Sequence, residues 1–284
     1  MAQALSNIIG KADLKYGKTL MAPLLITSIL IGAHISFGIL GSYPKLFAAI
    51  GAGIATELLL GRFILNEWRN IISAYISGIS VGILVRSPFI WPFVLCSVLS
   101  IMSKYVLRYK GTHIWNPSNF GIVALVLIAA DSTAVLSIQW GNNLWAMAVI
   151  WMVGFFSLYK INRFHICATY VLSFLAFGVV RAFYTGDPYI AEIAPLTGPM
   201  YQLFVLFMIT DPKTTVKTKW AQYVVVFLIA FVEMIFRLNG ALYAPFYALF
   251  LVGPISLVIE MWWREKKESN ESLESKSPSQ MVNA

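Results

Sequence analysis

Charge is the property that this sequence lacks most. Only 12% of its 284 residues are Asp, Glu, Lys or Arg, and 58% are hydrophobic, whereas soluble domains average about 25% charged and about 45–50% apolar residues. Eight of the charged side chains fall in residues 263–284, so the rest of the chain is poorer still. So few charges cannot cover a globular surface. The composition excludes a soluble domain and predicts an integral membrane protein.

Cysteine and histidine are also scarce. The two cysteines, Cys96 and Cys167, lie in separate apolar stretches without a CxxC partner. This excludes a disulfide scaffold, a cysteine-ligated iron–sulfur centre and c-type haem attachment. We therefore expect no metal site. No nucleophile accompanied by a base and an orienting group is visible, so the catalytic residues are unknown.

Long apolar runs separated by charged loops predict an all-α integral membrane protein with about ten transmembrane helices. An even number of spans puts both termini on the same side of the membrane. The expected spans cover residues 20–40, 46–61, 70–85, 88–103, 119–138, 144–159, 166–183, 197–210, 220–237 and 241–261.

The loop charges orient these spans. Seventeen of the 21 Lys and Arg residues fall on the side of the termini, and four fall on the opposite side: Lys45, Arg86, Arg181 and Arg237. Because positively charged loops remain in the cytoplasm, both termini are predicted to be cytoplasmic. The net charge of +8 is then a signal of topology, and we expect no nucleic-acid partner.

Ten spans divide into two five-helix halves, about residues 20–140 and 141–262, which would be inverted relative to each other and contain Pro-broken helices. A cytoplasmic N-terminal segment, residues 1–19, precedes this polytopic membrane domain of residues 20–262. Residues 263–284 are polar and poor in aromatics, and we predict a disordered cytoplasmic tail there.

Two polar segments with a proline interrupt the apolar pattern, residues 103–121 and 208–215. Proline suits the first turn of a helix, and Asn, Ser and Thr cap it. One interpretation is a pair of caps flanked by interfacial Lys and Arg. The other is that helix N–H groups face an anion or the polar edge of a cofactor. The candidate cofactor- or substrate-binding residues are Lys104, Arg108, His113, Asn116, Pro117, Ser118, Asn119, Thr210, Asp211, Pro212, Thr214 and Thr215.

Both segments resemble the signatures of one family of membrane proteins, and they occur in the same order. Residues 103–121 resemble its "SKY…R.KG.H.FNP.N.G" pattern, and residues 208–215 resemble "MATDPVTSP". The family (RnfD/NqrB) comprises the RnfD subunits of Rnf electron-transport complexes and the NqrB subunits of the sodium-pumping NADH:quinone oxidoreductase. The resemblance implies two inverted five-helix halves, a fold akin to urea and ammonium transporters. It also implies a place in the bacterial inner membrane, within the lipid bilayer and beside other membrane or redox subunits.

Members of this family carry flavin, usually FMN esterified to the threonine of an S/D-G-A-T loop between the two motifs. This sequence has no Gly-Ala-Thr between Pro117 and Pro212, and the nearest alternatives are Thr133 and Thr197. We expect these two residues to be ordinary caps, and we expect no covalent flavin. The chain resembles a compact member, similar to the short relatives in enediyne biosynthesis clusters. A non-covalent flavin, FMN or riboflavin, stays open.

Two carboxylates lie inside predicted spans, Glu57 and Glu233. A charge in hydrocarbon is costly, so each needs a partner, a cavity or an ion path. For Glu233 we favour a structural pair with Arg237, four residues later. For Glu57, proton or cation handling and a structural pair with Arg62 or an interfacial Lys are equally favoured.

The resemblance favours an RnfD-like membrane subunit that takes part in transmembrane electron transfer or ion-coupled transport. It would belong to an oxidoreductase complex without carrying the catalytic centre. The first alternative is a stand-alone transporter or channel for a small polar solute or ion, since two halves of five spans would suffice. The second is a membrane component of a biosynthetic pathway.

Overall fold

The computed structural model describes residues 40–135 and 144–276, together with residues 23–24, 26–28, 30–32, 34–35 and 38. Its elements in chain order are α2 (Tyr43–Leu65), α3 (Ile72–Leu84), β1 (Val85–Arg86), α4 (Trp91–Val106), β2 (Arg108–Tyr109), β3 (Thr112–His113), α5 (Pro117–Ile128), η1 (Ala130–Ser132), β4 (Ala134–Val135), α6 (Leu144–Ile161), α7 (Phe164–Thr185), α8 (Tyr189–Ile193), η2 (Ala194–Thr197), α9 (Pro199–Leu203), the π-helix η3 (Phe204–Met208), α10 (Lys219–Leu238) and α11 (Ala244–Lys276). The predicted helical class is confirmed. Two antiparallel pairs of two-residue strands, β1–β4 and β2–β3, are additions to it.

Four of the described helices are long and apolar enough to cross a membrane: α2, α7, α10 and residues 244–270 of α11. The segments 189–197 and 200–208, which meet at a bend of 65°, would make a fifth crossing if taken together. Helices α3, α4 and α5 are apolar but have only 13, 16 and 12 residues. The described residues therefore form a helical membrane protein with four or five long spans, and the ten-span map stays a prediction.

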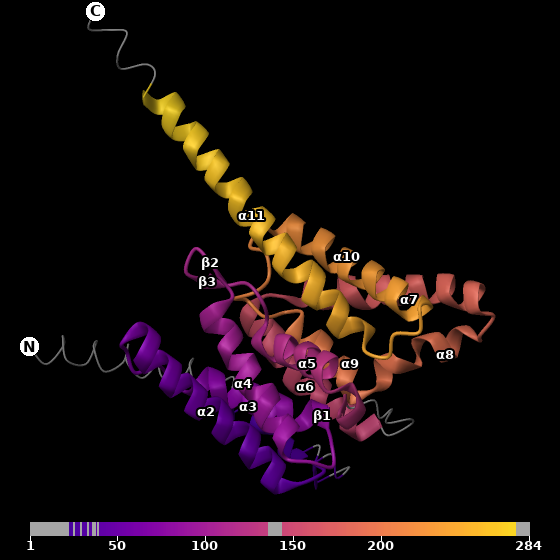
Figure 1. Cartoon of the computed structure of the whole chain (residues 1–284). Helices are drawn as coiled ribbons and strands as arrows, with labels where there is room; N and C mark the ends of the chain where they lie inside the picture. Colours follow the sequence, from indigo (N-terminus) through magenta and orange to yellow (C-terminus); the bar gives the residue numbers. More distant parts are fainter. Residues whose placement is uncertain are drawn as a thin grey trace, which may run out of the picture.

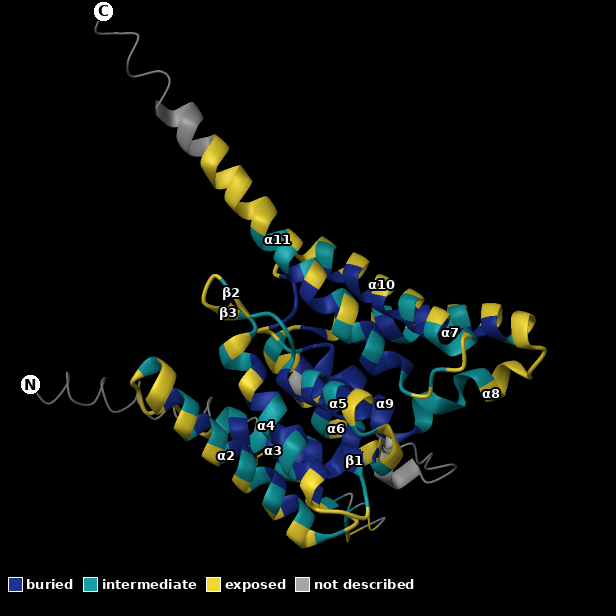
Figure 2. Ribbon diagram, in the orientation of Figure 1, coloured by how far each residue is buried: buried dark blue, intermediate teal, exposed yellow. Residues whose placement is uncertain are grey.

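The distribution of side chains agrees with a lipid environment. Charged and amide groups are buried, including Glu57, Arg181, Gln202 and Glu233. Many of the most exposed side chains are large and apolar, among them Phe63, Leu127, Leu172, Phe183, Leu242 and Ile255. Figure 2 shows exposed positions, in yellow, along the outer faces of helices such as α2, α7, α10 and α11. A surface rich in apolar side chains around a partly polar interior suits hydrocarbon as the surrounding solvent.

The helices form two packed groups on the two sides of the molecule (Figure 1). In the first half α2 packs against α3 and α4, and α4 packs against α5; in the second half α7 packs against α10, and α10 packs against α11. Glycines permit the closest approaches. A Cβ at Gly78 of α3 would lie 2.6 Å from Ile50 Cα of α2, and one at Gly121 of α5 would lie 2.6 Å from Cys96 O of α4. Small residues let helix backbones approach in membranes, where no hydrophobic force drives association.

The two halves meet where α5 crosses α11. Pro254 lies inside α11 and has no N–H, so it cannot bond to the carbonyl of Phe250 one turn earlier. The indole N–H of Trp115 donates to that Phe250 carbonyl at 2.9 Å. A side chain from the first half thus satisfies a backbone group that a proline freed in the second half.

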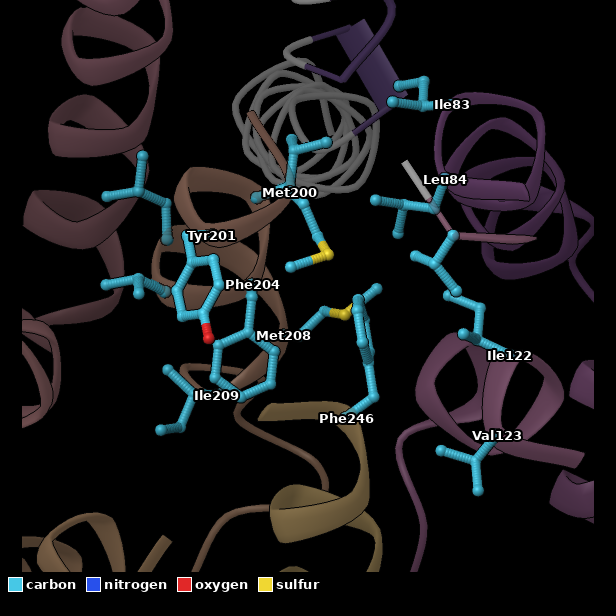
Figure 3. Packing of buried hydrophobic residues seen from close by; sticks show 14 of the residues in the cluster. Ile83, Leu84, Ile122, Val123, Met200, Tyr201, Phe204, Met208, Ile209 and Phe246 are labelled. Atoms are coloured by element: carbon cyan, nitrogen blue, oxygen red, sulfur yellow. The ribbon is translucent and has the colours of Figure 1, made fainter. Parts of the chain in front are cut away.

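A broken segment, residues 189–208, lies beside this crossing. It consists of α8, η2, α9 and η3; Pro195 lies in the first turn of η2, and Pro199 is the first residue of α9. Figure 3 shows apolar side chains of this segment, such as Met200 and Phe204, facing side chains of α3, α5 and α11. The buried core therefore gathers where the short and broken helices of both halves converge.

Two expectations differ from the structure, and others lie outside the described residues. The span expected at residues 119–138 is shorter, because α5 ends at Ile128 and a 3-10 turn containing Asp131 follows. The tail expected to be disordered from residue 263 continues α11 as far as Lys276. Its Glu, Lys and Arg residues favour helix, and Glu265 pairs with Lys110 of the β2–β3 turn. Residues 1–19, part of the first span, the boundary between the halves at 140 and residues 277–284 lie outside the described residues.

Candidate functional site

The two polar segments singled out in the sequence meet at one point. Asn116 is the N-cap of α5, and its side-chain nitrogen donates to Asp211 Oδ2 at 3.1 Å across a separation of 95 residues. Its side-chain oxygen accepts from the backbone N–H of Asn119 at 3.1 Å, as an N-cap does. Asn116 therefore caps its own helix and reaches the second segment at the same time. We call this contact the Asn116–Asp211 junction.

Asp211 organises the second segment. Its Oδ2 accepts from Thr214 Oγ1 at 3.0 Å, and its Oδ1 accepts from the backbone N–H of Lys213 at 3.1 Å. Its backbone carbonyl accepts from Thr215 Oγ1 at 2.6 Å. Thr210 is directed elsewhere and donates to Leu206 O at 2.8 Å. With Asn116 included, three donors hold the Asp211 carboxylate in one orientation.

Cations surround the junction. His113 lies on β3, where it pairs with Arg108 of β2, and it interacts electrostatically with Asp211. The cations that act on His113 are Lys104, Arg108 and Lys213. Burial lowers the pKa of His113 below its ordinary 6.5, the cations lower the pKa further, and Asp211 opposes the shift. The imidazole is therefore neutral near pH 7.

Arg163 is a further cation at the junction, and the sequence marked it only as a loop charge. It precedes α7 in a tight turn after Asn162, which has a left-handed φ of 53°. Its side chain is buried and interacts electrostatically with Asp211; burial lowers its pKa, and Asp211 opposes that shift. Among the described residues, its Nη1 has no hydrogen-bond partner.

Glu57 lies on α2 in a second polar contact, which joins two candidate residues from distant parts of the sequence. Its carboxylate forms an ion pair with Lys104 of α4, and its Oε1 accepts from Tyr105 OH at 3.0 Å. Lys104 also donates to Ser73 Oγ of α3 at 3.3 Å. Arg62, considered from sequence as the partner of Glu57, instead donates to Asn66. The helix geometry turns Arg62 away, because the position five residues on lies on another face.

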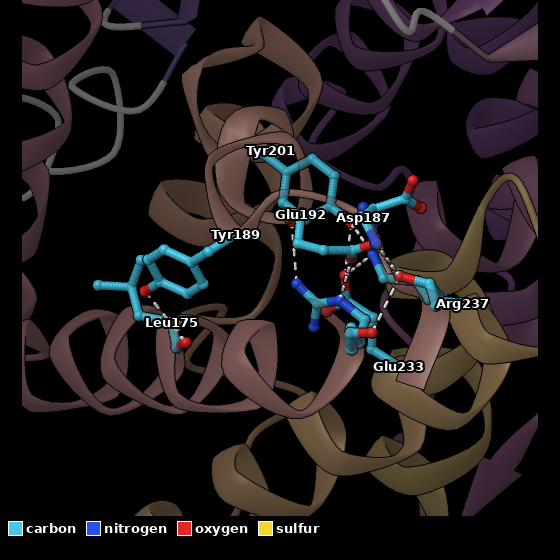
Figure 4. Close-up of polar contacts among 9 residues, drawn as sticks. Leu175, Asp187, Tyr189, Glu192, Tyr201, Glu233 and Arg237 are labelled. Atoms are coloured by element: carbon cyan, nitrogen blue, oxygen red, sulfur yellow. Dashed lines mark hydrogen bonds and ion pairs between the residues drawn. The ribbon is translucent and has the colours of Figure 1, made fainter. Parts of the chain in front are cut away.

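Glu233 on α10 is fully buried in a third contact (Figure 4). Tyr170 of α7 and Tyr201 of α9 both donate their hydroxyls to its carboxylate, and Figure 4 shows Tyr201 and Arg237 beside Glu233. Arg237 Nε lies 3.2 Å from Glu233 Oε1, the pair indicated by the i, i+4 spacing. Arg237 also donates to Tyr201 OH. The carboxylate is thus held by three groups from three helices.

The same region holds another buried arginine, Arg181. Its Nε donates to Glu192 Oε2 at 2.7 Å, and its guanidinium carbon lies 4.5 Å from the centre of the Phe174 ring. The guanidinium carbon of Arg237 lies 5.4 Å from the same ring. Both arginines belong to the four basic residues predicted to face away from the cytoplasm. A π-face shared by two guanidiniums stabilises cations in a poorly hydrated region.

A cavity of about 50 Å³ lies between α6, α7 and the broken segment, with Tyr201 and Gln202 on its wall. Gln202 is buried and donates to Thr197 O at 3.2 Å, while its Oε1 has no hydrogen-bond partner among the described residues. The cavity has room for a few water molecules.

The remaining candidates lie in the first turn of α5 and in the second segment, and one of them reaches α11. Pro117, Ser118 and Asn119 form the buried first turn of α5, and Asn119 Nδ2 donates to Phe246 O at 3.2 Å. Pro212 is exposed, and its carbonyl accepts from Lys217 Nζ at 2.7 Å.

The residues present do not fit a covalent flavin. Thr133 Oγ1 donates to Ala129 O, and Thr197 Oγ1 donates to Ala194 O, each at 2.7 Å. Both hydroxyls are occupied within their own turns, and neither has the small-residue run that the covalent attachment uses. In the part of the chain that the structure describes, no three His, Cys, Asp or Glu side chains lie close enough together to hold a metal ion.

Arg163, Tyr105, Tyr170 and Tyr201 complete these clusters. Tyr105 belongs to the "SKY" part of the first segment but was not among the candidate residues, and no motif or spacing pointed to the other three. A tyrosine in or near an apolar run is typical of an interfacial belt. Only the three-dimensional contacts distinguish these hydroxyls from such a belt.

No protein-family profile matches this chain, and a search of curated proteins found no significant match. The likeness to the RnfD/NqrB family therefore rests on the two segments alone.

Proposed function

We propose that this chain is an RnfD-like subunit of the bacterial inner membrane that takes part in transmembrane electron transfer or ion-coupled transport, together with partner subunits. The observation that carries the proposal is the Asn116–Asp211 contact of 3.1 Å. The two segments that resemble the family signatures are far apart in sequence, yet they join through the residues that the signatures share.

The buried carboxylates support a role in ion coupling. Glu57 and Glu233 both lie on apolar helices and are paired with groups from other helices. Ionisable residues inside a membrane are costly to maintain and commonly mark ion or proton pathways.

A repeated pattern supports the two inverted halves. Lys104, Arg108 and Gly111 have the same spacing as Glu233, Arg237 and Gly240. Both glycines have a positive φ, 77° and 75°, and each follows a helix that contributes to a buried carboxylate cluster. Five crossings between the two copies would reverse their orientation.

A stand-alone transporter is the second candidate, and the cavity beside Gln202 favours it. Broken helices that line a cavity at membrane depth are a common way to build a solute or ion site. In this case the chain would act without redox partners.

Two measurements test the proposal. Affinity purification of the full chain from native membranes should recover flavoprotein or iron–sulfur subunits, and an absorbance spectrum before and after acid precipitation reports any flavin. A protein that is recovered alone and is colourless would contradict the electron-transfer role and favour the stand-alone transporter. Colour that stays in the acid pellet would show covalent flavin and overturn our account of Thr133 and Thr197.

A matched set of variants tests the site. Asn116→Ala and Asp211→Ala should each lower the yield of the assembled complex at least about tenfold, since each leaves a polar partner unsatisfied at the junction. Thr133→Ala, which loses only a bond within its own turn, should assemble normally. Normal assembly of both junction variants would overturn the assignment.

A further inference from the structure

Arg163 is an unusual group at the Asn116–Asp211 junction. It is 9% exposed, and its Nη1 has no hydrogen-bond partner within the described part of the chain. A buried guanidinium nitrogen without a partner is unfavourable, because its N–H donors lose their hydrogen bonds to water and gain none in the protein. Its charge interacts with that of Asp211, although no ion pair between the two side chains forms among the described residues. However, the Asp211 carboxylate already accepts from Asn116, Lys213 and Thr214.

The charge balance at the junction is positive. Lys104 is neutralised by Glu57. Of the cations that act on His113 or Asp211, the exposed Arg108 and Lys213 and the buried Arg163 remain, and the carboxylate in this group is Asp211. His113 adds no charge near neutral pH, since its pKa is lowered. The 12-residue helix α5 also begins at the junction, and a helix N-terminus favours negative charge.

We infer that the junction binds an anionic ligand through a phosphate group, with Arg163 as its main contact. A phosphate matches the guanidinium fork and offers several acceptors to donors that are spread over α5, the β2–β3 turn and the α6–α7 turn. A phosphate dianion would offset the excess of cations. This inference rests on the proposed function in so far as both use the same junction.

The same phosphate chemistry has two sources, a soluble phosphate ester and a lipid headgroup. The junction lies on the side of the molecule with most of the positively charged loops, so both sources would reach it from the cytoplasm. The experiment separates them by the form in which phosphate is supplied.

The test uses the full chain, purified in detergent and exchanged into phosphate-free buffer of low ionic strength. Its melting temperature is followed while inorganic phosphate or pyrophosphate is added, with sodium chloride at matched ionic strength as the control. A ligand that binds only the folded protein raises the melting temperature. We expect a saturable rise with phosphate and none with chloride. No rise with either phosphate probe would overturn the inference.

Three variants and a control identify the contacts. Arg163→Gln should weaken phosphate binding at least about tenfold, and Lys213→Gln should weaken it several-fold. Asp211→Asn should strengthen binding, because it removes the competing negative charge while its amide oxygen still accepts from Asn116. Arg62→Gln, an exposed cation bonded to Asn66 outside the junction, should bind as the wild type does.

The expected changes in phosphate affinity, weaker in Arg163→Gln and stronger in Asp211→Asn, distinguish a phosphate site from a simple Arg163–Asp211 ion pair. If Arg163 only balances Asp211, then Arg163→Gln and Asp211→Asn will both leave phosphate binding unchanged, and the inference is wrong. If Arg163→Gln does not fold, Arg163→Lys keeps the charge and loses the fork, and it should bind phosphate more weakly than the wild type. Equal binding by Arg163→Lys would contradict a guanidinium contact.

Nanodiscs distinguish the two sources. In phosphatidylcholine discs, phosphate should raise the melting temperature. Arg62→Gln controls for lipid that binds outside the junction. If phosphatidylglycerol discs remove the rise in the wild type but not in Arg62→Gln, the lipid acts through the surface around Arg62, and the assignment of a headgroup to Arg163 is wrong. If the rise is removed in the wild type and in Arg62→Gln, a lipid headgroup occupies the junction. If the rise persists in both proteins, the ligand is a soluble phosphate ester.

None of these measurements reports electron or ion transport. A failure here therefore leaves the proposed function standing, and a failure of the proposed function leaves phosphate binding intact.

Discussion

Glu57 and Glu233 are both buried carboxylates on long apolar helices, yet they are held in different ways. Glu57 depends on one cation from another helix, Lys104, with one hydroxyl beside it. Glu233 shares its charge with two tyrosine hydroxyls and an arginine on its own helix. The first arrangement concentrates stabilisation in one contact, and the second distributes it. The loss of a single side chain should therefore affect the first cluster more.

Lys104→Met should have the largest effect, because it leaves the Glu57 carboxylate buried without a cation. Breaking a buried ion pair by removing one partner costs about 3–5 kcal/mol. The free energy of unfolding in mixed micelles, followed by circular dichroism, measures the change. The double variant Glu57→Gln with Lys104→Met should recover most of the loss, and Arg62→Met should show almost none. Equal losses in the single and double variants would show that the pair is not what stabilises α2 against α4.

Tyr201→Phe should have a smaller effect, about 2 kcal/mol, because Glu233 keeps Tyr170 and Arg237 as partners. Tyr170→Phe should cost about 1 kcal/mol, since the Tyr201 hydroxyl also accepts from Arg237, whereas the Tyr170 hydroxyl bonds to Glu233. The same unfolding measurement compares the two variants. A larger loss from Tyr170→Phe, or a loss from Tyr201→Phe that equals that of Lys104→Met, would contradict a distributed network.

Trp115→Phe tests the link between the two halves. It removes the donor to Phe250 O and should cost about 1 kcal/mol. In a Pro254→Ala background the new N–H at position 254 can bond to the same carbonyl, so Trp115→Phe should cost less there. A double-mutant cycle on the free energy of unfolding gives the coupling. Identical costs in the two backgrounds would mean that Trp115 does not stabilise the protein by bonding to the Phe250 carbonyl.

His113 should give the smallest effect, and only on acidification. Because burial and neighbouring cations lower its pKa in the folded state below 6.5, the unfolded chain binds a proton that the folded chain does not. Stability is therefore fully present above pH 6.5 and decreases as the pH falls below it. His113→Gln should reduce the drop in melting temperature between pH 7.5 and pH 5.5 by about 1–2 °C. A drop that is unchanged or larger would show that groups other than His113 control the loss of stability on acidification.

Individual residues of the candidate site could be predicted from the sequence, but most of their contacts could not. Asn116 and Asp211 were recognisable as a cap and a turn residue before a proline, because capping and proline geometry act over a few residues. Their mutual contact was not predictable, since it joins positions 95 residues apart. Glu57 and Glu233 were identifiable by their charge alone, and only one of their partners, Arg237, lies within a helical turn.

The positions of the helices were likewise predictable, whereas some of their ends were not. Each expected span from residue 46 onward overlaps a helix, because apolar runs report burial or lipid contact directly. The end of α5 at Ile128 and the helical course of residues 263–276 departed from expectation. Where these helices end depends on local helix propensity and on tertiary contacts such as that of Lys110 with Glu265, and composition does not reveal such contacts.

By itself the sequence determined that this is a helical membrane protein, because charge is costly in hydrocarbon and charged residues are therefore scarce in the apolar segments. It also determined which polar residues require an explanation. Only the tertiary structure decided which helices supply the partners of Glu57 and Glu233, and that the buried Arg163 interacts with Asp211 while its Nη1 has no partner among the described residues. The physical reason is that ion pairs and hydrogen bonds act over a few ångströms in space, whatever the distance along the chain.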